Sequence, residues 1–339
     1  MGDVMMKRVL LAILLCCLCF PALAEETVVI TFGGDCVLGT REEWKDTPGT
    51  FDEVIAREGL AYPFGGIEAI FREDDLTVVN LECALTPSSK GHDYTKQHTF
   101  RGDPSYARML LPAGIEMVNL ANNHYIDYGR TGRAATVAAL EDASVQYCGY
   151  GYRAIVELAG HRIGLGGCRE TVWKASAATV YRDIQALRKA GCEAVIYFTH
   201  WGKEYSETHN KTQARMAQYA VNSGADLIIG SHPHVPQGIS MVDGVPVVWS
   251  LGNLCFGGTH ELRSFDGLLV QATLHFDDSG YTGCDLKLYP ILTSGERPDN
   301  DFRPILAAGD EKERILDLVQ QDSELDIRQP LSFPSSNRK

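Results

Sequence analysis

Two histidines flank a proline in the stretch IIGSHPHVPQG (residues 228–238), directly after a short apolar run. Side chains two residues apart in an extended segment point to the same side of the chain, and Pro233 favours an extended backbone at His232. His232 and His234 are therefore predicted to present two imidazoles to one place. Paired imidazoles of this kind are typical ligands of a transition-metal ion.

Four other apolar runs also end in polar side chains that could complete a metal site. These side chains are Asp35 after VVITFGG, Asn80 and Glu82 at the end of LTVVNLE, Asn122, Asn123, His124 and Asp127 in ANNHYID, and His200 and Glu204 in THWGKE. In open α/β sheets, ligands bind at the carboxyl ends of the strands. If the five strands are parallel, these side chains converge at one edge.

Each of these residues has a simpler interpretation when it is taken alone. Asp35 follows two glycines and could cap a helix or form a turn. Glu82 could be a solvated charge at a strand end, Asn123 a turn residue, and His124 or His200 a satisfied polar side chain. The repetition of such residues at five strand ends is what favours a metal site.

The ligand types restrict the metal. Imidazole combined with carboxylate and amide oxygen suits Mn, Fe or Zn, whereas calcium prefers oxygen alone and structural zinc prefers thiolate. We expect one or two divalent ions, with Asp35 or Glu82 bridging two of them and His200, His232 and His234 divided between them. Such a centre lowers the pKa of a bound water and supplies hydroxide near neutral pH. Because imidazole binds metal only when neutral, we expect metal loss below about pH 6.

Residues near the expected ligands are assigned catalytic and binding roles. His124 is predicted to protonate the leaving group, and Asp127, three residues later, to orient its ring. The predicted substrate-binding residues are Asn80, Arg101, Arg169, Trp201 and Glu204. Arg41, Trp173 and Lys203 lie in comparable loops and could also contact an anionic polymer, although each alone is more often a solvated surface residue.

Apolar, β-branched runs alternate with helical patterns, which predicts an α/β fold with a mixed sheet. The expected strands are 27–32, 76–81, 115–120, 145–148, 155–158, 162–166, 194–198, 227–229, 238–242, 245–249, 268–274 and 285–289. The expected helices are 66–72, 104–111, 130–143, 176–190, 208–222 and 312–321. Residues 40–63 and 86–102 are expected to be long loops. No linker is evident, so residues 25–339 are predicted to be one domain with a C-terminal helix and tail.

The N-terminus has the pattern of a secretory signal peptide over residues 1–24. Lys7 and Arg8 precede an apolar run, and Ala22-Leu23-Ala24 has the small-x-small form of a cleavage site. We expect the protein to be secreted or extracytoplasmic, with an uncleaved membrane anchor as the alternative. Seven cysteines follow this segment without CxxC spacing, which predicts buried thiols rather than a disulfide framework.

The chain is acidic, with a formal net charge of −13. Removing residues 1–24 takes away two basic residues and one acidic residue and leaves 29 basic and 43 acidic residues, a charge of −14. A surface of this sign excludes nucleic acid as an expected partner.

Six motifs in order, GGDCVLG, NLECALT, ANNHYIDYG, HWGKEY, GSHPHVPQG and SLGNLCFG, resemble the CapA or PgsA family of capsule and poly-γ-glutamate synthesis proteins. The resemblance covers roughly residues 28–290. That family looks like a branch of the calcineurin-like metallophosphoesterases, which implies a four-layer α/β/β/α sandwich with a metal centre at the strand ends. Asp35, Glu82, Asn123, His200, His232 and His234 match its metal ligands, and His124 its acid.

One position departs from the broader superfamily, whose first motif is Asp-x-His. The second residue after Asp35 is Val37, so one metal position loses a nitrogen ligand.

The resemblance implies two functions. The first is a metal-dependent hydrolase linked to capsule or poly-γ-glutamate metabolism, acting on a phosphoester or on an anionic cell-envelope polymer. The alternative is a non-catalytic component of a polymer synthesis and export complex, with membrane proteins of that complex as partners.

Overall fold

The structure is a computed structural model that describes residues 26–45 and 47–335, so the predicted signal peptide (1–24) lies outside the described residues. A nine-stranded sheet has the order β17-β16-β15-β1-β3-β6-β7, with β14 beside β1 and β18 beside β16. Its strands are β1 (Glu26–Val37), β3 (Leu76–Leu81), β6 (Met117–Asn119), β7 (Gln146–Cys148), β14 (Asn253–Phe256), β15 (Asp266–Asp277), β16 (Gly280–Leu292), β17 (Ile305–Leu306) and β18 (Leu331–Pro334).

A second sheet has six strands in the order β12-β13-β11-β10-β9-β8. Its strands are β8 (Ala154–Leu158), β9 (His161–Arg169), β10 (Ala194–His200), β11 (Leu227–Ser231), β12 (Ile239–Val242) and β13 (Val245–Val248). The short strands β2 (Thr40–Arg41), β4 (Ala84–Leu85) and β5 (Phe100–Gly102) form a small third sheet.

Both large sheets have a parallel centre. Strands β1, β3, β6 and β7 run parallel in the first sheet, and β9, β10, β11 and β13 run parallel in the second. Two runs of carboxyl ends are thereby available to build one site. The apolar pattern alone predicted one mixed sheet, whereas the family resemblance implied two sheets packed in a sandwich.

The two sheets pack face to face through one apolar cluster. It contains Ile30 and Phe32 from β1, Phe198 from β10 and Ile229 from β11, all of them buried. The rings of Phe32 and Phe198 meet edge to face with centroids 5.7 Å apart. This packing fixes the distance between the two sets of strand ends.

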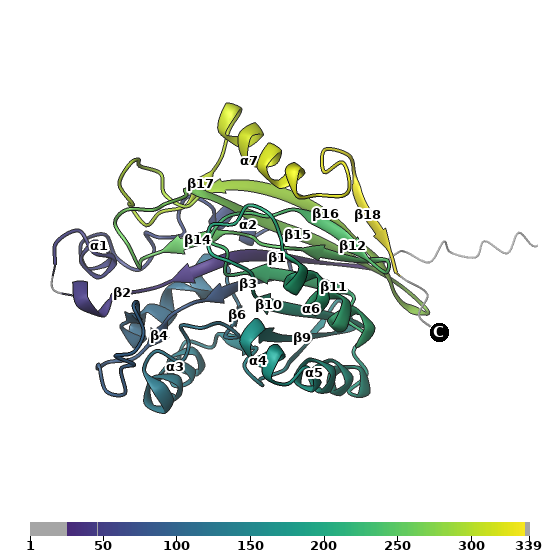
Figure 1. Cartoon of the computed structure of the whole chain (residues 1–339), viewed down its shortest axis with the longest axis horizontal. Coiled ribbons are helices and arrows are strands. Elements are labelled where there is room, and N and C mark those ends of the chain that lie inside the picture. Colours follow the sequence, from purple (N-terminus) through teal and green to yellow (C-terminus); the bar gives the residue numbers. More distant parts are fainter. Residues whose placement is uncertain (1–25, 46, 336–339) are drawn as a thin grey trace, which may run out of the picture.

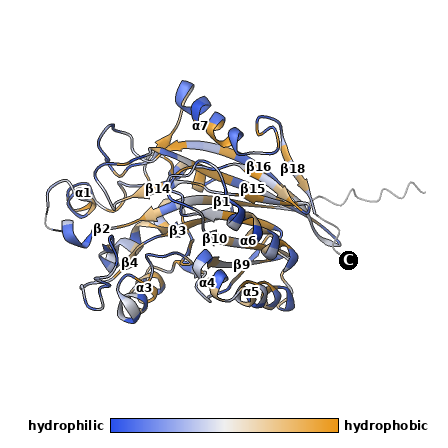
Figure 2. Ribbon diagram, in the orientation of Figure 1, coloured by the Kyte–Doolittle hydropathy of each residue, from blue (hydrophilic) through white to orange (hydrophobic). Residues whose placement is uncertain are grey.

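Helices cover the outer faces of the sheet pair, as Figure 1 shows for α3, α5 and α7. The helices are α1 (Phe51–Glu58), α2 (Glu68–Phe71), α3 (Gly129–Asp142), α4 (Glu170–Ala175), α5 (Ala178–Lys189), α6 (Lys211–Asn222) and α7 (Gly309–Gln321), with 3-10 turns η1 (Glu42–Trp44), η2 (Pro104–Met109) and η3 (Leu111–Ala113). Figure 2 shows orange apolar residues concentrated in the strands and blue polar residues on the helices' outer sides. Within 26–45 and 47–335, no helix is both long and apolar enough to cross a bilayer.

The predicted α/β class is confirmed by this mixed fold, which is consistent with a metallophosphoesterase-like architecture. The more specific four-layer sandwich stays a prediction. Each expected strand overlaps an observed one. The prediction of a loop over 40–63 is wrong in part, because α1 forms within it. The helix expected over 104–111 is a pair of 3-10 turns.

Gly34 lets β1 and the chain before β14 approach closely beside Asp35. A Cβ atom at Gly34 would lie 2.0 Å from the carbonyl oxygen of Gly252, the same oxygen that accepts the Asp35 backbone N–H at 2.9 Å. We expect Gly34→Ala to lower the free energy of unfolding by about 3 kcal/mol or more, as overpacking against rigid backbone does. Chemical denaturation measures this loss.

Gly65→Ala is the matched control, because a Cβ atom there meets its nearest neighbour at an ordinary 3.5 Å. If both variants unfold at the same denaturant concentration, the close approach at Gly34 is not a constraint on the fold.

Candidate metal centre

The side chains predicted to bind metal come from both sheets and meet between their strand ends. Asp35 lies near the end of β1 and Glu82 directly follows β3. His200 ends β10, and His232 and His234 follow β11. The convergence expected from the sequence is therefore present in the geometry, with two sheets supplying the residues.

Asp35 is fully buried and is held by three donors. Its Oδ1 accepts a hydrogen bond from Asn80 Nδ2 at 2.8 Å, and its Oδ2 accepts the backbone N–H of His232 at 3.1 Å. Nδ1 of His234 lies 3.1 Å from the same Oδ2. Asn80 is itself fixed, because its Oδ1 accepts from Asn119 and Asn122 at 2.9 and 3.1 Å.

Glu82 differs from Asp35 in that its carboxylate accepts no hydrogen bond from the described residues. It is fully buried, and neither Oε1 nor Oε2 has a hydrogen-bond partner among the described residues. Nε2 of His200 lies 3.3 Å from Oε1 but is directed instead at Asn123 Oδ1, 2.5 Å away. A buried carboxylate is costly unless a positive charge compensates it.

The loop that carries the two histidines is a tight bend with unusual backbone angles. His232 has φ of +99° and His234 has φ of +58°, so the extended conformation predicted for this stretch is wrong. Such angles cost about 1–3 kcal/mol for residues other than glycine. They nevertheless bring both rings to the site, and Nδ1 of His232 is buried without a hydrogen-bond partner.

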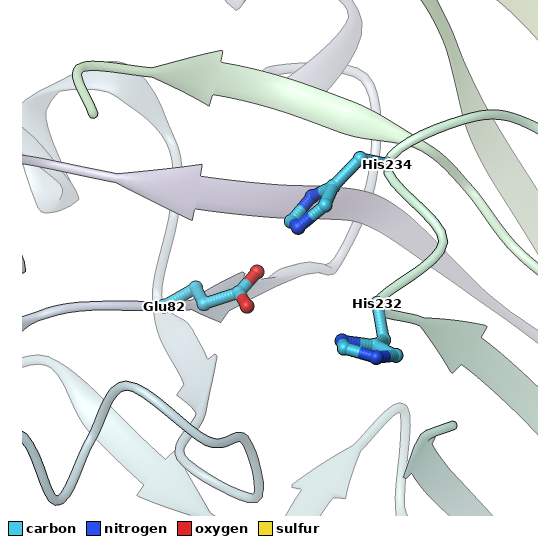
Figure 3. A group of neighbouring side chains, drawn as sticks. All are labelled: Glu82, His232 and His234. Carbon is cyan, nitrogen blue, oxygen red and sulfur yellow. The ribbon is translucent and has the colours of Figure 1, made fainter. Parts of the chain in front are cut away.

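Two groups of potential ligand atoms result, each within 4.8 Å. One contains Asp35, Glu82 and His200, and the other contains Glu82, His232 and His234. Figure 3 shows Glu82 and the two histidines pointing toward one another. Unpartnered oxygens on Glu82 and an unpartnered nitrogen on His232 are the atoms that a cation would satisfy, so the residues fit one or two metal ions that share Glu82.

Burial and neighbouring charges alter the pKa values of these groups. Burial and the Asp35 charge raise the pKa of Glu82 well above its usual value, whereas burial and nearby histidines lower the pKa of His200 and bring that of His232 to about 4. Burial alone would lower the pKa of His234, but the hydrogen bond to Asp35 and the charges of Asp35 and Glu204 together outweigh burial and raise it. For Asp35 burial is likewise outweighed, and the pKa is lowered.

His124 and Asp127 are in direct contact at the edge of this centre. Nδ1 of His124 lies 2.8 Å from Asp127 Oδ2, which also accepts the backbone N–H of Phe100 at 2.8 Å. Lys96 forms an ion pair with the other oxygen of Asp127. The contact leaves Nε2 of His124 for a ligand, and the ring lines a cavity of about 490 Å³.

The predicted substrate-binding residues are not gathered in one place. Arg101 makes a double hydrogen bond to Glu42. Trp201 is buried with its indole N–H donating to the Trp249 carbonyl, and its burial favours a packing role. Arg169 lines a cavity of about 280 Å³ and has an Nε without a hydrogen-bond partner.

Glu204 lines the same cavity as His124. The fifth residue, Asn80, is buried and bonded to Asp35, an arrangement that positions Asp35.

Several residues at the site were missed from the sequence. Asn253, whose Oδ1 lies 2.9 Å from His234 Nδ1, begins β14 inside the SLGNLCFG motif, so the motif was the available signal. Lys96 lies in a segment whose sequence shows no strand or helix pattern.

Val37, the position that departs from the superfamily, is buried in the core cluster under the helices. All seven cysteines after residue 25 are buried free thiols, as expected.

Comparison with known proteins identifies the family. The model of the bacterial capsule synthesis protein family PGA_cap matches residues 29–258. The chain belongs to this family. It is 26% identical to the capsule biosynthesis protein CapA of Bacillus anthracis over 81% of the chain and 70% of that protein. The PGA biosynthesis protein CapA of Bacillus subtilis is also 26% identical, over 76% of the chain and 70% of that protein.

A probable polyglutamine synthesis accessory protein of Mycobacterium tuberculosis is 24% identical over 70% of the chain and 71% of its own length. The family resemblance seen in the six motifs is thereby confirmed.

We expect a divalent metal ion to displace protons when it binds. Glu82 and His234 have raised pKa values, so protons compete with metal for these two groups at higher pH than for an ordinary carboxylate or imidazole. Lowering the pH therefore weakens metal binding and raising it strengthens binding. Calorimetric titration with Mn²⁺ in two buffers of different ionisation enthalpy, between about pH 5 and 8, measures the protons released.

His275→Ala is the matched control, since His275 lies on β15 and contacts Asp285. This variant should bind metal as the unaltered protein does, and Glu82→Gln should bind it much more weakly. An affinity for Mn²⁺ that does not change with pH would contradict the competition.

Proposed function

We propose that this protein is a metal-dependent hydrolase that acts on an acidic cell-envelope polymer, or on a phosphoester related to one, in capsule or poly-γ-glutamate metabolism. The observation that supports it most is the buried, unpartnered carboxylate of Glu82 shared by two groups of potential ligands. Membership of the capsule synthesis family and the names of the Bacillus relatives support the choice of polymer.

The residues proposed to hold the metal are Asp35, Glu82, Asn123, His200, His232 and His234. Divalent Mn, Fe or Zn bound there would polarise the scissile group and lower the pKa of a water. Asn80 positions Asp35, and Asn253 positions His234. Both are therefore assigned as positioning residues.

His124 is proposed as the general acid. Asp127 accepts a hydrogen bond from Nδ1 and fixes the ring, while burial lowers the pKa of His124. The acid is the doubly protonated imidazolium, whose Nε2 proton passes to the oxygen or nitrogen of the leaving group as its bond to the scissile centre breaks, which leaves His124 neutral. The ion pair between Lys96 and Asp127 holds that carboxylate in its orientation. Glu82 lies among the potential metal ligands, and His124 lies at the edge of that centre, where it lines the adjoining cavity.

We expect His124→Ala to lower kcat by about 10²–10⁴-fold, the range for loss of a positioned general acid, while metal content stays unchanged. Steady-state kinetics with metal analysis of the same sample measures both. His260→Ala, which removes a ring stacked on Trp44, is the control. Full turnover in His124→Ala would remove His124 from the mechanism.

Chelation is the direct test of the function. The protein stripped with EDTA should hydrolyse neither aryl phosphates nor poly-γ-glutamate, and Mn²⁺, Fe²⁺ or Zn²⁺ should restore one of these activities. Release of nitrophenol and the length of the polymer by gel filtration are the measurements. Metal dependence would be refuted if activity survives chelation in a sample whose metal content is below about a tenth of stoichiometric occupancy.

A second candidate is a non-catalytic component of a polymer synthesis and export complex. The observation that favours it is Val37, which is buried in the core where the broader superfamily has an imidazole ligand. A metal-loaded protein that binds poly-γ-glutamate, or membrane proteins of such a complex, without shortening any polymer would support this candidate over the hydrolase.

We also propose that the protein works outside the cytoplasm, on the basis of the signal pattern in residues 1–24. Recovery of the chain from the medium or periplasm, with its N-terminus determined by mass spectrometry, tests this and separates cleavage from anchoring.

A further inference from the structure

The cavity beside His124 has an unusual charge for this chain. Its described lining consists of Arg41, Lys96, Gln97, His98, Asn123, His124, Glu204, Tyr205 and Arg263. Three of these residues are permanently cationic and one, Glu204, is a carboxylate. The whole chain has a formal charge of −13, so the cationic lining is a local feature and does not follow from composition.

Two of the three cations form no ion pair with a carboxylate among the described residues. Lys96 is already bound to Asp127 and to the carbonyl of Asn123. Arg41 instead stacks over Trp44, with its guanidinium carbon 4.4 Å from the ring centroid. Arg263 stacks over Tyr205 in the same way at 4.0 Å.

The two arginines are held in place by stacking on aromatic rings rather than by an ion pair. A guanidinium stacked on an aromatic face keeps its in-plane N–H donors available for an oxyanion. Nε of Arg41 is buried and has no hydrogen-bond partner, which is costly until an acceptor binds. By contrast, Arg101, the neighbouring arginine on β5, is fully engaged by Glu42.

The position of His124 shows which part of a substrate would meet these arginines. A general acid must lie within hydrogen-bond reach of the leaving-group atom that it protonates, and His124 lines this cavity. On the proposed function, the leaving group therefore occupies the cavity. A separate and mostly apolar cavity of about 280 Å³ lies beside Arg169 and shares no lining residue with the His124 cavity.

We propose that the leaving-group side of the substrate carries a negative charge, and that Arg41 and Arg263 bind it. This inference rests on the proposed function, whose site it deepens. Tyr205 and Arg263 also line a second cavity of about 360 Å³ with Arg297 and Arg314. Arg297 is already paired with Glu311 and Arg314 with Asp266. Arg41 and Arg263 are therefore the arginines proposed to distinguish a charged leaving group from a neutral one.

A pair of substrates that differ only in leaving-group charge tests the proposal. The pair is 4-carboxyphenyl phosphate and its neutral isostere 4-carbamoylphenyl phosphate, each assayed with Mn²⁺-loaded protein. Arg41→Gln and Arg263→Gln should each lower kcat/KM for the carboxylate by about tenfold, mainly through KM, as expected for loss of a hydrogen bond to a charged group. The amide should change little. Comparing variant with unaltered protein on each substrate cancels the intrinsic difference between the two leaving groups.

Arg303→Gln is the matched control, because Arg303 also stacks over a tyrosine, Tyr62, at 5.6 Å but does not line this cavity. It should leave both substrates unaffected. Equal losses on the carboxylate and the amide in Arg41→Gln and Arg263→Gln would overturn the proposal.

A binding measurement separates this proposal from the proposed function. Calorimetry with 4-carboxybenzylphosphonate and 4-carbamoylbenzylphosphonate needs no turnover, and the carboxylate should bind about tenfold more tightly, a preference lost in the double arginine variant. Preference without any turnover would support the anion pocket and refute hydrolysis. Turnover without preference would support hydrolysis and refute the anion pocket.

Discussion

A carboxylate enclosed between two sheets without a hydrogen-bond donor is the constraint on which this structure depends. Removing a charged carboxylate from water costs several kcal/mol even after the protein relaxes, and Glu82 has no compensating donor among the described residues. The chain nevertheless surrounds Glu82 with imidazoles, and two of these, His200 and His232, have lowered pKa values that favour the neutral, metal-binding form. A fold that keeps such an arrangement is suited to a cation at Glu82.

The rest of the architecture holds this arrangement rigid. Two parallel sets of strands end at the same place because the apolar cluster between the sheets fixes their separation. Buried amides complete the scaffold: Asn80 anchors Asp35, and Asn253 anchors His234. The left-handed backbone angles at His232 and His234 are a further local cost, and well-packed surroundings are needed to maintain them.

The sequence predicted the strands and the polar residues at their ends because both depend on local patterns. Runs such as LTVVNL are mostly apolar and are buried throughout, and a charged side chain directly after such a run is easily recognised. Local patterns did not predict how the strands divide between two sheets, since pairing is decided by long-range packing, and only the family resemblance implied a two-sheet sandwich. The bend at His232 was missed because the local effect of Pro233 favours an extended neighbour, whereas in the fold the backbone N–H of His232 donates to Asp35 on a distant strand. Arg263 stands alone in a loop, and its unpaired state follows only from the arrangement of its neighbours.

Charge at the centre is distributed in a way that links the metal site to its ligand. Of the three carboxyl groups buried at the centre, Asp35 contacts His234 and Asp127 pairs with Lys96. Glu82 is the one without a hydrogen-bond partner among the described residues, and burial with the nearby Asp35 charge raises its pKa. Among the cations lining the adjoining cavity, Lys96 pairs with Asp127, whereas Arg41 and Arg263 stack on aromatic rings and form no ion pair among the described residues. The carboxylate of Glu204 lines the same cavity. A cation would compensate the buried carboxylate of Glu82, and an anion would compensate the arginines that line the cavity. Because Coulomb interactions are strong where water is excluded, a cation held at Glu82 and the two arginines would together attract an acidic ligand to a chain whose overall charge repels it.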